Sequence, residues 1–259
     1  MPKILVCYKW VLDEQDIRIN PNDLSLDVSR AKGKISDFDR NAIEEAVLLV
    51  ERLGGTVDAL TYGTPAAKQS LKDVLSRGPN KVYWIQDPAA EKADAHVIAT
   101  VLAGAIRRIG SYDLIICGEG SSDSYNQQMA SRLAATLDLP AVTFTSQITS
   151  DNGTLKFTRK LDDCTEVATV SGPAVVSVLG EINHPRIPGL KQVLGASKKP
   201  SEEIKLADLG LSPQELTPRA IRKSVKGFVM SRKNVIFKDG DAAHKVAQLV
   251  ASLAKEGLS

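Results

Sequence analysis

Apolar and polar residues follow each other along the first 140 positions in a pattern that predicts strands separated by helices. Short apolar runs of strand length lie at residues 3–8, 56–61, 81–85 and 113–117. Apolar residues recur at helical spacing over residues 39–53, 65–76 and 93–109, and again after Tyr125 as far as Leu137. The order predicts an α/β fold, Rossmann-like, in which a parallel sheet carries helices on both faces. Asp39 is a candidate cap for the helix over 39–53, and Gly54 and Gly55 end that helix.

The pattern changes after residue 146. Short strands are predicted at residues 147–149, 154–160, 166–170 and 174–178. Asn152-Gly153 is a strong hairpin signal, and residues 161–163 form a second candidate turn. Beyond Pro200, a short strand at 235–237 and a helix over 241–255 are expected. These features predict an α/β domain over 1–200 and a C-terminal extension over 201–259, of which 195–235 has weak periodicity and three prolines.

The loop after the strand at 113–117 carries the strongest chemical signal. Glycines and serines end the strand at Gly118, and a helix follows the loop. Backbone N–H groups at the start of a helix are unpaired and partly positive, so a phosphate can bind there. The loop is neither GxGxxG nor GxxxxGK[ST]. The spacing by itself therefore leaves nucleotide binding and a purely structural turn both open.

Composition narrows the class of protein. The chain has 259 residues, of which 43% are hydrophobic and 25% charged, and its net charge is +2. Neither sign of charge is in the excess typical of proteins that bind nucleic acid or a membrane surface. No apolar run reaches the roughly 18 residues that span a bilayer, and no signal-peptide pattern opens the chain, so a cytoplasmic protein is expected.

The sequence carries no pattern typical of a metal site or a catalytic motif. Three cysteines and three histidines are widely spaced, which predicts reduced thiols and no metal site. Neither serine of the loop, Ser121 or Ser122, lies in a GxSxG motif, and no catalytic residue is assigned.

Five blocks of sequence resemble a known family. They are residues 3–19 (KILVCYKWVLDEQDIRI), 34–49 (KISDFDRNAIEEAVLL), 73–87 (DVLSRGPNKVYWIQD), 118–128 (GEGSSDSYNQQ) and 172–200 (GPAVVSVLGEINHPRIPGLKQVLGASKKP). In this order they are similar to the beta subunit of electron transfer flavoproteins, and most similar to the FixA-type branch of bacterial anaerobic carnitine metabolism. The resemblance implies an adenine-nucleotide-binding domain of the HUP type.

The resemblance also implies a set of binding residues. The loop residues that would wrap the nucleotide are Gly118, Glu119, Gly120, Ser121, Ser122, Asp123, Ser124 and Tyr125. Its phosphate would lie at Asn126, Gln127 and Gln128. The backbone at Cys7 and near Tyr62 would border the adenine, and the other side would be closed by Ser36, Asp37, Phe38 and Asp39. The sequence SDFD and the serine-rich loop depart from the members that bind AMP, so AMP and a second FAD both remain open as the occupant.

The partners follow from the same resemblance. An alpha subunit would complete a heterodimer, hold most of a redox FAD and contact the C-terminal extension. Electrons would pass between NADH or a dehydrogenase and an acyl-CoA-dehydrogenase-like partner, with crotonobetaine reduction and electron bifurcation as options. Leu190, in a recognition loop over about 178–200, would anchor that partner.

Two other classes compete with this electron carrier. An ATP-binding regulatory module of the universal-stress-protein type would use the same fold without flavin. An enzyme that cleaves ATP at its α-phosphate ranks lowest, because CYKWVLDEQD stands where that class carries an SGGxDS-like loop.

Overall fold

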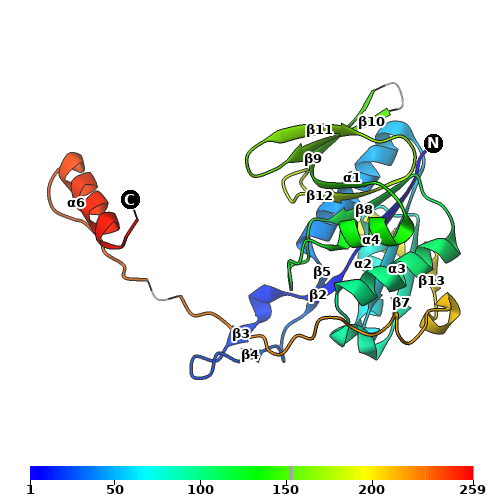
Figure 1. Cartoon of the computed structure of the whole chain (residues 1–259), viewed down its shortest axis with the longest axis horizontal. Coiled ribbons are helices and arrows are strands. Elements are labelled where there is room, and N and C mark those ends of the chain that lie inside the picture. Colours follow the sequence, from blue (N-terminus) through cyan, green and yellow to red (C-terminus); the bar gives the residue numbers. More distant parts are fainter. Residues whose placement is uncertain (152–153, 231, 259) are drawn as a thin grey trace. The chain divides into compact units, whose positions relative to one another are not determined.

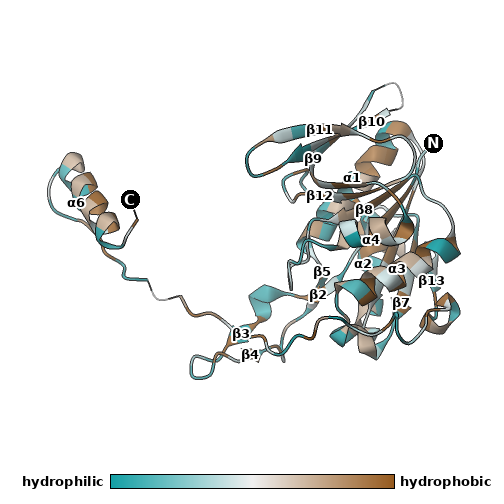
Figure 2. Ribbon diagram, in the orientation of Figure 1, coloured by the Kyte–Doolittle hydropathy of each residue, from teal (hydrophilic) through white to brown (hydrophobic). Residues whose placement is uncertain are grey.

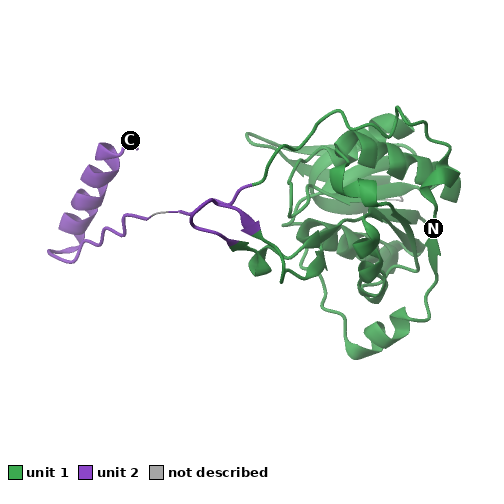
Figure 3. Ribbon diagram, turned by 90° about the horizontal axis from the view of Figure 1, so that it is seen from below, with its two compact units in different colours: residues 1–18, 27–225 green, residues 19–26, 226–259 purple. Residues whose placement is uncertain are grey.

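The computed structural model describes residues 1–151, 154–230 and 232–258, and these fall into two compact units (Figure 3). The first unit contains residues 1–18 and 27–225. The second contains residues 19–26 and the chain from residue 226 onward. The boundary expected at residue 200 falls within the sequence of the first unit.

Within the described residues, the first unit is built on a nine-stranded sheet in the order β11-β10-β9-β12-β8-β1-β6-β7-β13 (Figure 1). Its strands are β1 Lys3–Cys7, β6 Thr56–Gly63, β7 Lys81–Gln86, β8 Leu114–Gly118, β9 Ala141–Asp151, β10 Thr154–Lys160, β11 Thr165–Thr169, β12 Ala174–Val178 and β13 Ser201–Glu203. From β9 to β13 in this order neighbouring strands are parallel, whereas β9, β10 and β11 pair antiparallel. The short strands β2 Trp10–Leu12 and β5 Gly33–Ile35 pair with each other, as do β3 Arg18–Ile19 and β4 Leu26–Asp27.

Helices cover both faces of this sheet. They are α1 Asp37–Leu53, α2 Leu71–Ser76, α3 Ala95–Ile109, α4 Met129–Leu137 and α5 Leu190–Ala196, with 3-10 turns η1 Glu14–Asp16, η2 Pro65–Ser70, η3 Pro88–Lys92 and η4 Leu206–Leu209. One core cluster joins the sheet to α1 and α2, and a second joins it to α3 and α4. The predicted α/β Rossmann-like architecture is therefore confirmed.

The two cores follow from the alternation of side chains along buried strands. In β1, Ile4 and Val6 pack on the α1 side, whereas Leu5 and Cys7 pack on the α3 side. Because helices cover both faces of the sheet, side chains on both faces of these strands are buried, and the strands are continuous apolar runs in the sequence. Figure 2 shows that hydrophobic residues concentrate along the central strands.

Several local predictions need correction. Helix α1 begins at Asp37, so Asp39 lies inside it and does not cap it, while Gly54 ends the helix at φ 74° as expected. The helix after the loop begins only at Met129, because Tyr125 and Gln127 have positive φ values of 42° and 54°, which no α-helix accommodates.

The later strands and turns mostly agree with prediction. The predicted strand at 147–149 extends into β9, and the turn at 161–163 is closed by the Leu161 N–H donating to the Cys164 carbonyl at 2.9 Å. The Asn152-Gly153 turn lies outside the described residues.

The residues after Pro200 belong to both units: those up to 225 lie in the first and those from 226 onward in the second. Within the first unit, Ile204 is buried, and Leu206, Leu209, Leu211 and Leu216 pack against the α3 core, so residues 201–216 belong to the folded domain. The strand expected at 235–237 does not form. In the second unit, α6 Ala242–Lys255 forms as predicted, capped by Asp241, and none of its residues is buried. No helix among the described residues is long and apolar enough to cross a membrane.

Candidate functional site

Three strand ends meet at one edge of the sheet. Strand β1 lies between β6 and β8, and Cys7 pairs in register with Leu60 on one side and Cys117 on the other. The segments 7–9, 61–64 and 117–120 therefore converge. Ligands of open parallel sheets bind beyond these carboxyl ends.

Asp39 ties two of the strand ends to helix α1. Its carboxylate accepts the backbone N–H of Lys9 at 2.8 Å and that of Gly118 at 3.2 Å. The side chain is buried, with 6% of its surface exposed. Burial raises the pKa of Asp39 to about 7, because removal from water disfavours the charged form more than the two N–H groups favour it. Asp39 thus has a structural role: it holds the ends of β1 and β8 against the first turn of α1.

Two serines join the loop to the start of α1. The N–H of Asp37, at the first position of the helix, donates to the Ser122 hydroxyl at 3.1 Å. In return, the Ser122 N–H donates to the Ser36 hydroxyl at 3.2 Å. Ser36 precedes the helix but makes no cap bond of its own, so Ser122 satisfies an N–H of α1 from the loop. The predicted block Ser36–Asp39 and the predicted loop therefore meet.

The loop folds back on itself through Tyr125. Its N–H donates to the Ser121 carbonyl at 2.9 Å, and its hydroxyl donates to the Glu119 carboxylate at 3.0 Å. The Tyr125 ring lies 5.1 Å from the ring of Phe38, centroid to centroid. Tyr125 and Gln127 are both left-handed, a conformation that costs energy in residues with a side chain and often marks a ligand-binding segment.

The two glycines of the loop are required by close approach. A Cβ on Gly118 would lie 2.7 Å from a carboxylate oxygen of Asp39 and 2.8 Å from the backbone of Phe38. A Cβ on Gly120 would lie 2.6 Å from the Tyr125 ring. Glycine at these positions therefore lets the first turn of α1 and the folded-back loop pack against the end of β8.

Beyond the loop, helix α4 begins without a side-chain cap. The three predicted phosphate residues, Asn126, Gln127 and Gln128, directly precede it and are exposed. Gln128 accepts a hydrogen bond from the guanidinium of Arg132 at 2.8 Å, which adds a positive charge one turn into the helix. Uncapped N–H groups with a nearby arginine suit an anion such as phosphate.

The side chains of Cys7 and Tyr62 point into the core on the α3 side. Only their backbone can border a ligand, as the resemblance implies. Lys9 was not singled out from the sequence, although it directly follows β1. Its ammonium pairs with Asp123 at 2.6 Å, and this ion pair lowers the pKa of Asp123 despite partial burial. Lys9 thus offsets an acid of the loop that would otherwise repel a phosphate.

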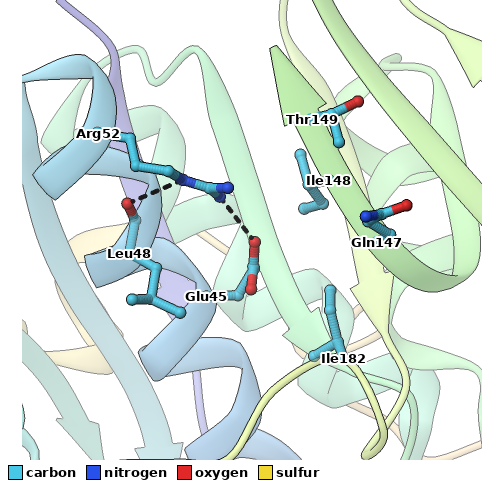
Figure 4. A pocket seen from close by; sticks show the side chains of 7 residues that line it. All are labelled: Glu45, Leu48, Arg52, Gln147, Ile148, Thr149 and Ile182. Carbon is cyan, nitrogen blue, oxygen red and sulfur yellow. Dashed lines mark hydrogen bonds and ion pairs between the residues drawn. The ribbon is translucent and has the colours of Figure 1, made fainter.

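A hollow lies away from this edge, between α1 and β9 (Figure 4). Its volume is about 220 Å³, and its lining residues are Glu45, Leu48, Arg52, Gln147, Ile148, Thr149 and Ile182. Arg52 and Glu45, both on α1, form an ion pair at 3.3 Å along one wall of it. No predicted site residue lines this hollow. The described residues also contain no cluster of three or more histidine, cysteine, aspartate or glutamate side chains that could hold a metal ion.

Comparison with protein families decides the class. A family model described as the electron transfer flavoprotein domain matches residues 23–209, which include the loop, α1 and the segment around Leu190. The chain belongs to the electron transfer flavoprotein family. Proteins of this family carry electrons, generally with FAD and in some cases with AMP, and they work with partner subunits and dehydrogenases. The electron-carrier hypothesis is therefore favoured over the ATP-binding regulatory module.

In this electron transfer flavoprotein, Leu190 is exposed but not at the tip of a loop. It is the first residue of α5, and 75% of its surface is accessible. Ile187 and Leu194 on the same segment are exposed as well, which makes a short apolar surface.

Proposed function

We propose that this chain is the beta subunit of an electron transfer flavoprotein, of the FixA-type branch, and that it pairs with an alpha subunit. The heterodimer passes electrons between NADH or a dehydrogenase and an acyl-CoA-dehydrogenase-like partner. The reduction of a carnitine-derived crotonobetaine substrate, with electron bifurcation, is the route that the sequence resemblance favours. The protein acts in the cytoplasm.

The observation that carries the proposal is the junction between the 118–128 loop and α1. Reciprocal serine contacts, the Asp39 carboxylate and two glycines without room for a Cβ bring this loop to the carboxyl ends of β1, β6 and β8. The uncapped start of α4 faces the end of the same loop. These features fit an adenine nucleotide, with its phosphate at residues 126–128 and the base near the backbone of Cys7 and Tyr62.

The occupant of this chain is AMP or a second FAD, and the shared redox FAD lies mostly on the alpha subunit. When bound, a flavin supplies the redox chemistry, and the protein supplies binding and electrostatics. In this chain, α4 and Arg132 would orient the phosphate and the loop from Gly118 to Tyr125 would border the nucleotide, while Lys9 compensates the charge of Asp123.

Exposed apolar residues of the C-terminal extension support a contact with the alpha subunit. Helix α6 leaves Val246, Leu249, Val250 and Leu253 exposed. Such a stripe at helical spacing is expected to be covered by another chain. The C-terminal extension also carries Phe228, Val229 and Met230 in exposed positions.

The test is co-expression with the companion alpha subunit, followed by release and counting of nucleotides per heterodimer. Two FAD and no AMP would place a second flavin in this chain and support the bifurcating branch. One FAD with one AMP would make the nucleotide of this chain structural and the protein a simple carrier. If neither flavin nor a copurifying subunit were found, the proposed function would be rejected.

Leu190→Ala tests the anchoring role separately. Because the side chain is mostly exposed, stability should change by less than about 0.5 kcal/mol. The KM for the dehydrogenase partner should rise about tenfold or more, as expected for an interface hot spot. Val167→Ala, which truncates another exposed apolar residue on β11, is the matched control and should leave the KM unchanged.

A further inference from the structure

An arginine beside the exposed apolar surface is held by two acids of helix α1. The Arg186 guanidinium contacts both carboxylate oxygens of Glu44 at 2.9–3.0 Å and those of Glu51 at 2.7 and 3.0 Å. The Arg186 N–H also donates to Glu44, at 3.1 Å. Only 7% of the Glu44 side chain is exposed, so one acid of this pair is nearly removed from water. Bidentate contacts of this kind fix the orientation of the arginine as well as its position.

Asn183 makes a second attachment three residues earlier. Its side-chain amide donates to the Asn41 carbonyl at 3.0 Å and to the Glu45 carboxylate at 3.1 Å. The Asn41 amide in turn donates to the carbonyls of Gly180 and Asn183 at 3.0 and 2.9 Å. Glu44 and Glu45 lie one turn after Asn41 on α1, so one side of this helix holds residues 180–186.

The apolar surface begins directly after these attachments. Ile187 is 93% exposed, and Leu190 follows after Pro188 and Gly189. Pro185 and Pro188 limit the backbone freedom on both sides of Arg186 and Ile187. Nothing else in the sequence from 187 to 190 is buried. On its C-terminal side the surface continues into α5, which packs against α2 and buries Ala196. On its N-terminal side the orientation of the surface depends on the contacts that hold residues 183–186.

We propose that Arg186 is a positioning residue. By fixing residues 183–186 on α1, it holds the adjoining apolar surface of Ile187, Leu190 and Leu194 in the orientation that the electron-exchanging partner binds. Association then avoids the entropy loss of ordering the segment. Helix α1 also carries Asp39 in the first turn, so the chain that leads into the docking surface and the nucleotide loop are both attached to one helix. This inference rests on the proposed function, since it assigns a cause to the orientation of a docking surface.

The test uses heterodimer purified with its companion subunit. Arg186→Lys keeps the charge but removes the bidentate geometry, and the pair Glu44→Gln/Arg186→Gln removes both charges without leaving a buried carboxylate unpaired. Arg159→Gln is the matched control, because Arg159 pairs with Glu166 between β10 and β11, away from this segment. The probe is a purified acyl-CoA dehydrogenase of the same organism, with its concentration varied.

For the double variant we expect a KM for the dehydrogenase about fivefold higher or more, with kcat within twofold of the parent. The KM of Arg186→Lys should lie between those of the parent and the double variant, and the KM of Arg159→Gln should equal that of the parent. Amide hydrogen exchange at residues 187–194 should be faster in the double variant alone, while exchange in β1 and β8 stays unchanged. A purely stabilising role would instead change exchange throughout the domain.

Three outcomes would overturn the inference. The first is a folded double variant in which residues 187–194 exchange no faster than in the parent, whatever its activity. The second is an unchanged KM in the double variant while Leu190→Ala raises the KM. If Leu190→Ala leaves the KM unchanged, the docking role in the proposed function fails, and the positioning inference is overturned with it. Faster exchange would then show only that Arg186 orders the segment.

Discussion

Replacing Asp39 by asparagine should remove a large part of the pH dependence of stability. In the folded protein the pKa of Asp39 is raised to about 7 by burial, against an ordinary value of 3.8. Between these two pH values the folded state keeps a proton that the unfolded chain has lost. Stability from this group is therefore fully present below about pH 4 and is lost as the pH rises to about 7.

The magnitude follows from the two pKa values. Their difference corresponds to about 4 kcal/mol at roughly 1.4 kcal/mol per pKa unit. Because part of this effect is already lost at pH 4.5, the free energy of unfolding of the parent, compared with Asp39→Asn, should fall by about 3 kcal/mol between pH 4.5 and pH 8. The asparagine cannot ionise, and its amide oxygen still accepts one of the two N–H groups of Lys9 and Gly118.

The assay is urea unfolding of both proteins at half-unit steps of pH, followed by circular dichroism. All other titrating groups are shared, so only the difference between the two curves reports Asp39. Asp113→Asn, which replaces an exposed acid that also accepts a backbone N–H, from Lys3, is unfolded in the same series as the control for the substitution itself. Parallel curves for the parent and Asp39→Asn would refute the reasoning, because they would mean that Asp39 ionises in the folded protein as readily as in the unfolded chain.

Three further changes test the rest of the site and the C-terminal extension. Gly118→Ala should cost about 2 kcal/mol in urea unfolding, because its Cβ meets the backbone of Phe38 at 2.8 Å, and should reduce the nucleotide that copurifies. Ser122→Ala should cost about 1 kcal/mol, as for a lost helix cap, whereas Ser124→Ala should cost less in the same assay. Val246→Asp/Leu253→Asp should leave the unfolding of the α/β domain unchanged but abolish copurification of the alpha subunit; retained heterodimer would contradict the role of α6.

Local patterns predicted much of the fold. Fully buried strands such as β8 appear as apolar runs, and Gly54 ends α1 because its positive φ suits glycine. The sequence pattern failed where long-range contacts replace local ones. Asp39 looks like a helix cap but serves as a brace to Lys9 and Gly118, which lie 30 and 79 positions away. The strand predicted at 235–237 does not form, since a short apolar run needs a partner strand to pair with.

The sequence by itself determined the class of fold and the presence of a loop after β8, and its resemblance proposed the residues of the nucleotide site. These depend on apolar periodicity and on glycine and serine at particular places, which can be read in order along the chain. Only the tertiary structure decided that Ser122 caps α1, that Lys9 compensates Asp123, and that Arg186 is held by Glu44 and Glu51. Each of these contacts joins residues far apart in sequence, and their geometry exists only after the sheet has brought the strand ends and α1 together.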